Sequence, residues 1–315
     1  MVTRFQGRAR IAALVASALI ATTLAGCAQP KPNQTSAPKA TVNVVASVQV
    51  WANLAQEIGG SYVTAKAIIA SPNQDPHAYE ATVRDQLAVN MADLTIENGL
   101  GYDIFFAQLT AAKPKTTGAR LILSKVLPNF TDSNPHVWYS LEATEIAANA
   151  LTKKIAKALG TKQAPGSAAS YVVARHAKLI AAIRGLENKA AKLAHKNRGR
   201  HLNALLAENF ATDFVASAGI RDATPTAFYN AVESGMDASP ILMAKLHRLI
   251  SDHKISLVVL NAQSAGAQSS QLALWATAAK IPVMSWSELL PSRQSYLSWM
   301  AKNLNQISKV QPANE

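Results

Sequence analysis

The chain has 315 residues and carries 31 Lys and Arg against 19 Asp and Glu, a net charge of +12. A basic balance of this size can indicate nucleic-acid binding, but the sequence has no motif of a nucleic-acid-binding fold, so we expect no nucleic acid as a partner. The single cysteine, Cys27, excludes an internal disulfide and a cysteine-based zinc site. Much of the excess charge lies between Lys153 and Arg200, where Glu187 is the only acid, and we interpret it as solvated helix surface near an anionic membrane.

The N-terminus predicts an exported lipoprotein. Three arginines precede an apolar stretch over residues 11–23 that is short for a membrane-spanning helix, so residues 1–26 are predicted to be a signal peptide. The sequence Leu24-Ala25-Gly26-Cys27 resembles the bacterial lipoprotein box. We therefore expect Cys27 to be lipidated and to anchor the protein on the extracytoplasmic face of the cell membrane, with residues 27–40 as a flexible tether. The alternative is a plain signal peptide with a chance cysteine.

After the tether, short β-branched runs alternate with amphipathic helices, which is typical of parallel α/β sheets. About 275 residues remain, enough for two such lobes. We predict an N-terminal α/β lobe over residues 41–160 and a C-terminal α/β lobe over residues 198–315. The N-terminal lobe is predicted to contain strands at 41–47, 63–70, 92–97 and 119–124, and helices at 48–58, 80–91, 102–112 and 141–159.

One unusually long helix is predicted over residues 165–197, between the lobes. Apolar residues recur along it at alternating steps of three and four, apart from one turn filled by His176. At 1.5 Å per residue such a helix spans ~45 Å and can join the two lobes rigidly. The C-terminal lobe is predicted to contain strands at 201–207, 223–228, 255–261 and 281–286, and helices at 241–252, 264–280 and 291–307.

Two similar turns each place a histidine after a proline and ahead of an aromatic residue. They are Asp75-Pro76-His77-Ala78-Tyr79 and Asn134-Pro135-His136-Val137-Trp138. Proline fixes φ, an Asp or Asn before it can cap a turn, and neutral imidazole is the commonest metal ligand. Because both turns, and the segments 207–214 and 286–291, follow predicted strands, we expect them to converge on one cleft between the lobes. The alternative is two ordinary turns that contain histidine.

These features together resemble one family, the metal-binding lipoproteins that supply manganese or zinc ABC importers, sometimes called adhesins. The resemblance rests on the lipoprotein box, the two histidine turns, the segment ENGLGYD (Glu97–Asp103) and the long helix, and it extends from Cys27 to about Ile307. It implies two lobes with parallel-type sheets joined by a rigid helix, and one divalent ion held between them by four side chains. It also implies a permease and an ATPase as partners; we expect a monomer and no catalytic activity.

The resemblance assigns the metal ligands residue by residue. His77 and His136 match the two histidines of the N-terminal lobe, and Glu208 matches the third position, which manganese-type members fill with Glu and zinc-type members commonly with His. The fourth ligand is usually an Asp just after the last strand, but this chain has Trp286 there, and Glu288 is the nearest carboxylate. The predicted ligands are therefore His77, His136, Glu208 and Glu288.

Two points about these ligands stay open in the sequence. Asp213 is a rival to Glu208 within the same segment. Asp75 and Glu80 either orient the imidazoles or simply cap the turns.

Two imidazoles and two carboxylates form a mixed nitrogen and oxygen shell, which favours Mn²⁺ over Zn²⁺ as the bound ion. Zinc-type relatives often carry a His-rich acidic loop, and the comparable stretch over residues 111–134 has no histidine. The alternative functions are a surface adhesin without a transport role and a secreted metallohydrolase. Neither HExxH nor Gly-x-Ser-x-Gly occurs in the chain, which argues against the hydrolase.

Overall fold

The computed structural model describes residues 42–76, 78–113, 118–127, 134–160, 166–264 and 266–312, all within the unit Pro38–Glu315. The predicted signal peptide, Cys27 and its tether, and His77 lie outside the described residues. Among the helices within these ranges, none is long and apolar enough to cross a bilayer.

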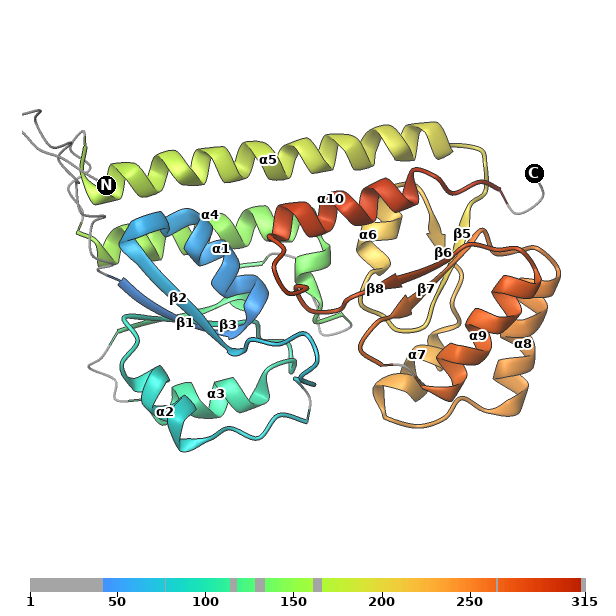
Figure 1. Cartoon of the computed structure of the whole chain (residues 1–315), viewed down its shortest axis with the longest axis horizontal. Coiled ribbons are helices and arrows are strands. Elements are labelled where there is room, and N and C mark those ends of the chain that lie inside the picture. The colour runs from blue at the N-terminus through green and yellow to red at the C-terminus, as the bar shows by residue number, and fades with distance from the viewer. Residues whose placement is uncertain are drawn as a thin grey trace, which may run out of the picture. The chain divides into compact units, whose positions relative to one another are not determined.

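The N-terminal lobe is a parallel four-stranded sheet in the order β2-β1-β3-β4, with helices packed against it (Figure 1). Six of the seven residues of β1 are buried, as expected for a central strand of a sheet covered on both faces. Its strands are β1 (Val42–Val48), β2 (Val63–Ile69), β3 (Leu94–Glu97) and β4 (Ala119–Ile122). Its helices are α1 (Gln49–Gly59), α2 (Val83–Asn90), α3 (Ile104–Ala111) and α4 (Leu141–Ala158), with 3₁₀ turns η1 (Gly60–Tyr62), η2 (Leu123–Lys125) and η3 (Val137–Tyr139).

The C-terminal lobe repeats this plan, with a parallel sheet in the order β6-β5-β7-β8. Both sheets contain a point where chain order reverses, between β1 and β3 in one and between β5 and β7 in the other, which is where open α/β sheets bind ligands. The strands are β5 (Asn203–Leu206), β6 (Arg221–Asp222), β7 (Leu257–Asn261) and β8 (Val283–Trp286). The helices are α6 (Thr212–Ser217), α7 (Thr226–Glu233), α8 (Pro240–Ser251), α9 (Ala267–Ala278) and α10 (Tyr296–Ile307).

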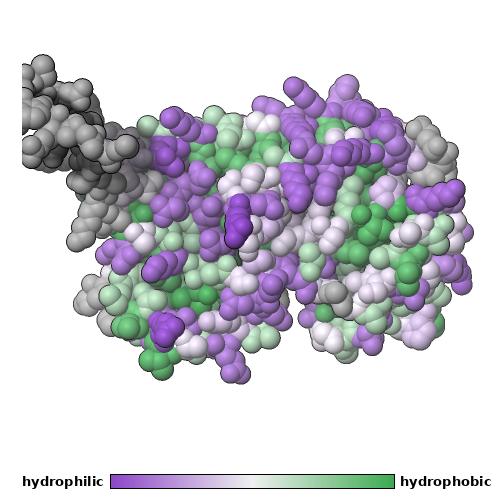
Figure 2. Space-filling model, viewed as in Figure 1, coloured by the Kyte–Doolittle hydropathy of each residue, from purple (hydrophilic) through white to green (hydrophobic). Residues whose placement is uncertain are grey.

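The long helix α5 (Ala168–Asn197) connects the lobes with 30 residues. Ser167 caps its first turn by accepting a hydrogen bond from the backbone of Ser170. The helix packs against α1 and α4 of the N-terminal lobe and against α6 and α10 at its other end (Figure 1). Figure 2 shows hydrophilic side chains gathered over the outer part of this helix, and a notch between the lobes on the side away from it. The predicted fold class, two parallel-sheet lobes joined by a long helix, is confirmed.

Most of the predicted apolar seam of α5 is buried. Val172, Leu179, Ile183 and Leu186 are buried, and Leu193 is partly buried against the same core. His176, which fills the missing turn of the seam, has Nε2 2.8 Å from Oδ1 of Asn149 on α4. The seam is therefore the surface through which α5 holds the lobes together.

The strand predicted at 223–228 is wrong. Strand β6 ends at Asp222, whose carboxylate accepts hydrogen bonds from the Thr224 backbone (2.9 Å) and the Tyr229 hydroxyl (2.7 Å). These bonds close a turn, and Pro225 then stands at the N-cap of α7. Helix α6 was also not predicted from the sequence.

The last helix begins at Tyr296, not at Pro291. The Ser295 side chain accepts a hydrogen bond from the Ser298 backbone N–H, and the Ser298 side chain accepts one from the Ser295 backbone N–H, forming a capping box. This reciprocal cap fixes the start of α10 five residues later than predicted.

Gly219, between α6 and β6, offers a test of how closely α5 packs on the C-terminal lobe. Its φ is +75°, and a Cβ added there would lie 2.7 Å from the Ala194 Cα of α5. Gly235 has a similar φ of +66°, but a Cβ there would meet nothing within 4 Å. We expect Gly235→Ala to lower the free energy of unfolding by about 1 kcal/mol, the cost of the left-handed backbone. Gly219→Ala should lower it by about 3 kcal/mol, because the backbone must also move. Urea unfolding of both variants checks this, and equal losses would contradict the close packing.

Candidate metal centre

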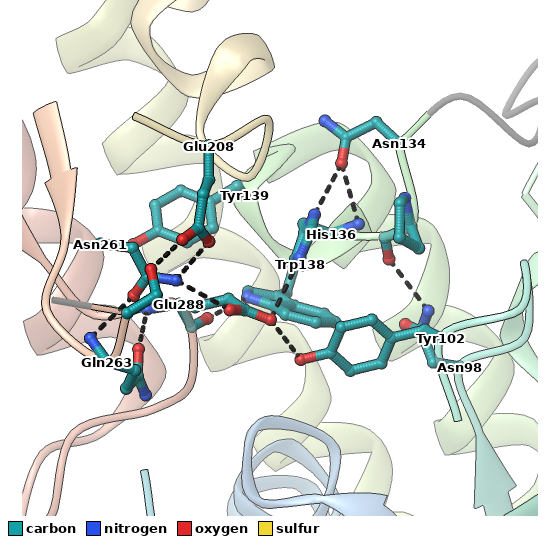
Figure 3. Close-up of polar contacts among 12 residues, drawn as sticks. Asn98, Tyr102, Asn134, His136, Trp138, Tyr139, Glu208, Asn261, Gln263 and Glu288 are labelled. Atoms are coloured by element: carbon teal, nitrogen blue, oxygen red, sulfur yellow. Dashed lines mark hydrogen bonds and ion pairs between the residues drawn. The ribbon is translucent and has the colours of Figure 1, made fainter. Parts of the chain in front are cut away.

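Side chains from both lobes meet at the carboxyl ends of the strands. His136 lies between β4 and η3, Glu208 follows β5, Asn261 ends β7 and Glu288 follows β8. They line a cavity of about 560 Å³ together with residues of the loop that follows β2. Figure 3 shows these side chains turned toward one another. The expectation that strand ends converge on one cleft therefore matches the structure.

His136 is held so that one of its ring nitrogens faces the carboxylate of Glu288. Oδ1 of Asn134 lies 3.0 Å from both the backbone nitrogen and Nδ1 of His136. An amide oxygen only accepts, so Nδ1 carries a proton, and Nε2 is directed at Oε1 of Glu288, 3.1 Å away. A hydrogen bond from Nε2 to Glu288 therefore requires the ring to carry both protons, and an ion that replaces the Nε2 proton would meet the lone pair of that nitrogen. The partner that orients this imidazole is thus an amide and not one of the acids considered in the sequence.

The Glu97–Asp103 segment fixes the turn that carries His136. The Asp103 carboxylate accepts hydrogen bonds from the backbone of Asn98 (2.6 Å) and Gly99 (2.9 Å), which closes the loop after β3. The Asn98 amide then donates to the Pro135 carbonyl at 2.9 Å (Figure 3). This segment therefore ties the end of β3 to the His136 turn and holds that turn in place.

Glu288 is 8% exposed, and every polar atom it carries has a partner. Its Oε1 accepts from the Tyr102 hydroxyl at 2.7 Å, and its Oε2 accepts from the Asn261 amide at 3.0 Å. Its backbone N–H donates to Gln263 at 2.6 Å, and its carbonyl accepts from the Trp138 indole at 2.9 Å. Glu288 is therefore fixed by groups from both lobes (Figure 3).

These contacts keep Glu288 ionised. Burial alone would raise the pKa of its carboxyl, but the hydrogen bond and charge of His136, with the donors Tyr102 and Asn261, outweigh burial and lower the pKa to about 2. Burial, and then the Glu288 charge, raise the pKa of Tyr102 well above its usual value. The tyrosine hydroxyl therefore stays protonated and remains a hydrogen-bond donor.

Glu208 is half-buried directly beyond β5. Its Oε2 accepts from Asn261 Nδ2 at 2.6 Å, and its Oε1 accepts from the Ser264 hydroxyl. Burial, reinforced by the nearby Glu288 charge and opposed by the Asn261 hydrogen bond, raises the pKa of Glu208 to about 7. A proton and a cation therefore compete for this carboxylate near neutral pH.

The cavity is acidic although the protein is basic. Four carboxylates, Asp75, Glu208, Glu233 and Glu288, are among its described lining residues, and no Lys or Arg is. The chain as a whole has a net charge of +12. A cleft that gathers one sign of charge against the sign of the whole protein attracts the opposite ion, here a cation.

The structure brings together three of the four predicted ligands, His136, Glu208 and Glu288. His77 lies outside the described residues, although the two residues before it line the same cavity. His136 contacts Glu288 directly, whereas Asn261 stands between Glu288 and Glu208. Accordingly, within the described residues no three His, Cys, Asp or Glu side chains are gathered closely enough to hold a metal ion.

The other acids considered from the sequence are Asp213, Asp75 and Glu80, and of these only Asp75 lines the cavity. Asp213 is exposed on the first turn of α6 and is not among the residues that line the cavity. Asp75 lines the cavity, and Glu80 is exposed. Trp286, in the place of the expected Asp, is buried: its ring stacks on Tyr139 and its Nε1 donates to Gln306.

Sequence reasoning missed three residues of the site, Tyr102, Asn261 and Gln263. Tyr102 lies inside the ENGLGYD segment, which in the sequence carries only a family resemblance and no role for the tyrosine. Asn261 is the last residue of β7 and Gln263 follows it, so the rule that sites form beyond strand ends could have found both.

The chain matches one protein family over most of its length. The profile of the family described as zinc-uptake complex component A, periplasmic, matches residues 44–310. A metal ABC transporter substrate-binding lipoprotein of Streptococcus cristatus, ScbA, is 28% identical over 147 residues, 42% of this chain and 47% of that protein. A manganese ABC transporter substrate-binding lipoprotein of Streptococcus gordonii, scaA, is 27% identical over 145 residues, 42% and 46% of the two proteins. The chain thus spans about half the length of the curated relatives it matches.

Solved structures share the fold. The periplasmic zinc binding protein TroA from Treponema pallidum superposes with a TM-score of 0.69 at 18% identity, covering 85% of this chain and 98% of that one. The binding protein FpvC from Pseudomonas aeruginosa, in complex with Mn²⁺, gives a TM-score of 0.70 at 16% identity, covering 85% and 97%. At these identities the likeness establishes the fold alone.

The family resemblance drawn from the sequence is confirmed, because the matching profile covers most of the chain. The same family match argues against the alternative of a secreted metallohydrolase. The chain belongs to the family of zinc-uptake complex component A, periplasmic, which consists of solute-binding proteins for metal uptake and not of enzymes.

Proposed function

We propose that this protein captures one divalent transition metal ion outside the cytoplasm and delivers it to the permease of an ABC importer, which an ATPase drives. The observation that carries the proposal is the acidic cavity, which buries carboxylates beside a histidine without any Lys or Arg among its described lining residues. In so basic a protein, that arrangement suits a cation as cargo.

The proposed ligands are His77, His136, Glu208 and Glu288. His136 Nε2 and Glu288 Oε1 lie 3.1 Å apart, so an ion that coordinates both would replace their direct contact. Glu208 is joined to Glu288 through one amide group and faces the same cavity. Residues 73–76, which directly precede His77, line this cavity as well.

We propose Mn²⁺ as the cargo in preference to Zn²⁺. Two carboxylates can supply up to four oxygen ligands, which suits the higher coordination number of manganese, whereas zinc prefers four ligands rich in His or Cys. The relatives carry both metals in their names, manganese in the Streptococcus gordonii lipoprotein and zinc in the Treponema pallidum protein. The preference therefore rests on the donor set of this chain.

We also propose that the protein acts as a monomer held to the membrane by lipid on Cys27. The lipoprotein box at Leu24–Cys27 supports the anchor, and both matched Streptococcus relatives are named lipoproteins. Several acyl chains on one cysteine would hold the protein stably at the membrane.

The ligand assignment predicts how single variants bind metal. His136→Ala and Glu288→Ala should each weaken Mn²⁺ binding by at least about 100-fold, because each removes a direct ligand. A 100-fold loss corresponds to about 2.7 kcal/mol of binding free energy. Titration should give one ion per chain for the wild-type protein. Asp213→Ala is the matched control and should bind like wild type, since Asp213 does not line the cavity. If Asp213→Ala loses binding while Glu288→Ala retains it, the ligand set is mistaken.

The metal preference predicts which metal is bound to protein purified from its own host after growth with ample manganese. Elemental analysis should find about one manganese per chain. This must be measured on protein loaded in the cell, because most nitrogen and oxygen sites bind zinc more tightly than manganese in vitro. Zinc alone under these conditions would contradict the manganese preference and leave the ligand set untouched.

The anchor predicts a change of location. Cys27→Ala removes the only cysteine and with it the acylation site, so fractionation should recover this variant in the soluble fraction while the wild-type protein sediments with membranes. Ala25→Gly, which keeps Cys27, serves as the control. A Cys27→Ala protein that stays fully membrane-bound would exclude the lipid anchor.

A further inference from the structure

The strand order of the second sheet puts Asn261 between the two carboxylates. Strands β5, β7 and β8 are neighbours, and β7 is the central one of the three. Glu208 lies two residues beyond the end of β5, and Glu288 two residues beyond the end of β8. Asn261 is the last residue of β7, so its side chain meets one acid on each side (Figure 3).

One amide nitrogen binds both acids. Nδ2 of Asn261 donates to Oε2 of Glu208 at 2.6 Å and to Oε2 of Glu288 at 3.0 Å, which uses both of its hydrogens. The amide cannot be flipped, because its Oδ1 accepts from the Gln263 backbone at 3.0 Å. Asn261 is 3% exposed, so water does not compete for these bonds.

The chemistry of the amide matters for a cation site. Two carboxylates held this close repel each other, and in a buried site repulsion usually protonates one of them or recruits a Lys or Arg. An amide brings them together through hydrogen bonds and adds no positive charge. An incoming divalent ion that displaces the proton from Glu208 would then compensate both negative charges.

We propose that Asn261 is a positioning residue that sets the spacing and orientation of Glu208 and Glu288, and thereby favours Mn²⁺ over Zn²⁺. This inference rests on the proposed function of the cavity. With one oxygen of each acid bound to the same nitrogen, the two carboxylates present their oxygens jointly, as an ion with many oxygen ligands requires. Zinc can be held tetrahedrally by the imidazoles and one oxygen from each acid, so it depends less on that arrangement.

The test compares Mn²⁺ and Zn²⁺ affinities of the purified protein with those of Asn261→Leu, which has a similar size and no donor. Competition with a chelating indicator gives both dissociation constants. We expect Asn261→Leu to bind Mn²⁺ about 100-fold and Zn²⁺ about 10-fold more weakly, so the ratio of the two constants shifts about tenfold. Asn261→Ser, which keeps a single donor, should shift it less, and it carries the test if circular dichroism shows that Asn261→Leu does not fold.

The matched control is Asn197→Leu. Asn197 is also buried, and its amide donates to the Ala218 carbonyl at 2.8 Å, away from the cavity. Loss of that bond should lower the thermal stability but leave the affinity ratio unchanged, because a folding defect scales both affinities by the same competent fraction. If the Asn261 variants weaken both ions equally, or neither, Asn261 has no positioning role. If the wild-type protein binds neither ion, the proposed function fails, and this inference with it.

Discussion

The structure depends on placing two carboxylates in a cleft that has no Lys or Arg among its described lining residues. Desolvating an ionised carboxylate costs several kcal/mol unless hydrogen bonds replace the lost water. Here the replacements are neutral donors: the Tyr102 hydroxyl and the Asn261 amide on Glu288, and the same amide with Ser264 on Glu208. The pKa values of the two carboxyl groups differ as a result. Glu288, with the most donors and a histidine, is stable as an anion, whereas Glu208 holds a proton into the neutral range. A divalent ion compensates both charges at once, which the neutral donors cannot do.

The same requirement ties the lobes together, because the donors come from both. Trp138 of the N-terminal lobe donates to the Glu288 carbonyl, and Tyr139 donates to the carbonyl of Ser287. From the other side, Gln263 accepts from the Glu288 backbone and donates to Pro72, in the loop that follows β2. A change in the position of one lobe would therefore move several donors of Glu288 together. The segment of the proposed ligand Glu288 and the contact between the lobes are thus one hydrogen-bonded unit.

Local patterns predicted most of the fold and part of the site. The parallel sheets and α5 follow from periodicity and caps, which are encoded by neighbours in sequence. The strand predicted at 223–228 is wrong because its apolar residues suit either a strand or a helix. Asp222 closes a turn there by accepting a hydrogen bond from Tyr229, so the chain enters a helix instead. Glu288 was found as the nearest carboxylate to a missing Asp. The strand-end rule could also have placed Asn261 in the site, but not between the two acids, because that position depends on β7 lying between β5 and β8. Strand order is a property of the folded sheet, and the identity of a single residue does not predict it.

The contact between the lobes also limits how the site can select its ion. Tyr139 is fully buried, and its ring lies 5.2 Å from Phe210, 5.2 Å from Trp299 and 5.7 Å from Phe214, all of the C-terminal lobe. Exposing one such ring would cost roughly 4–6 kcal/mol at about 25 cal/mol per Å² for 150–250 Å² of surface. With α5 packed along both lobes as well, a wide hinge opening would have to break a continuous aromatic core. In the proposed metal site, discrimination between ions of equal charge must then come from the arrangement of the donors, and we propose that the hydrogen bonds behind the carboxylates fix that arrangement.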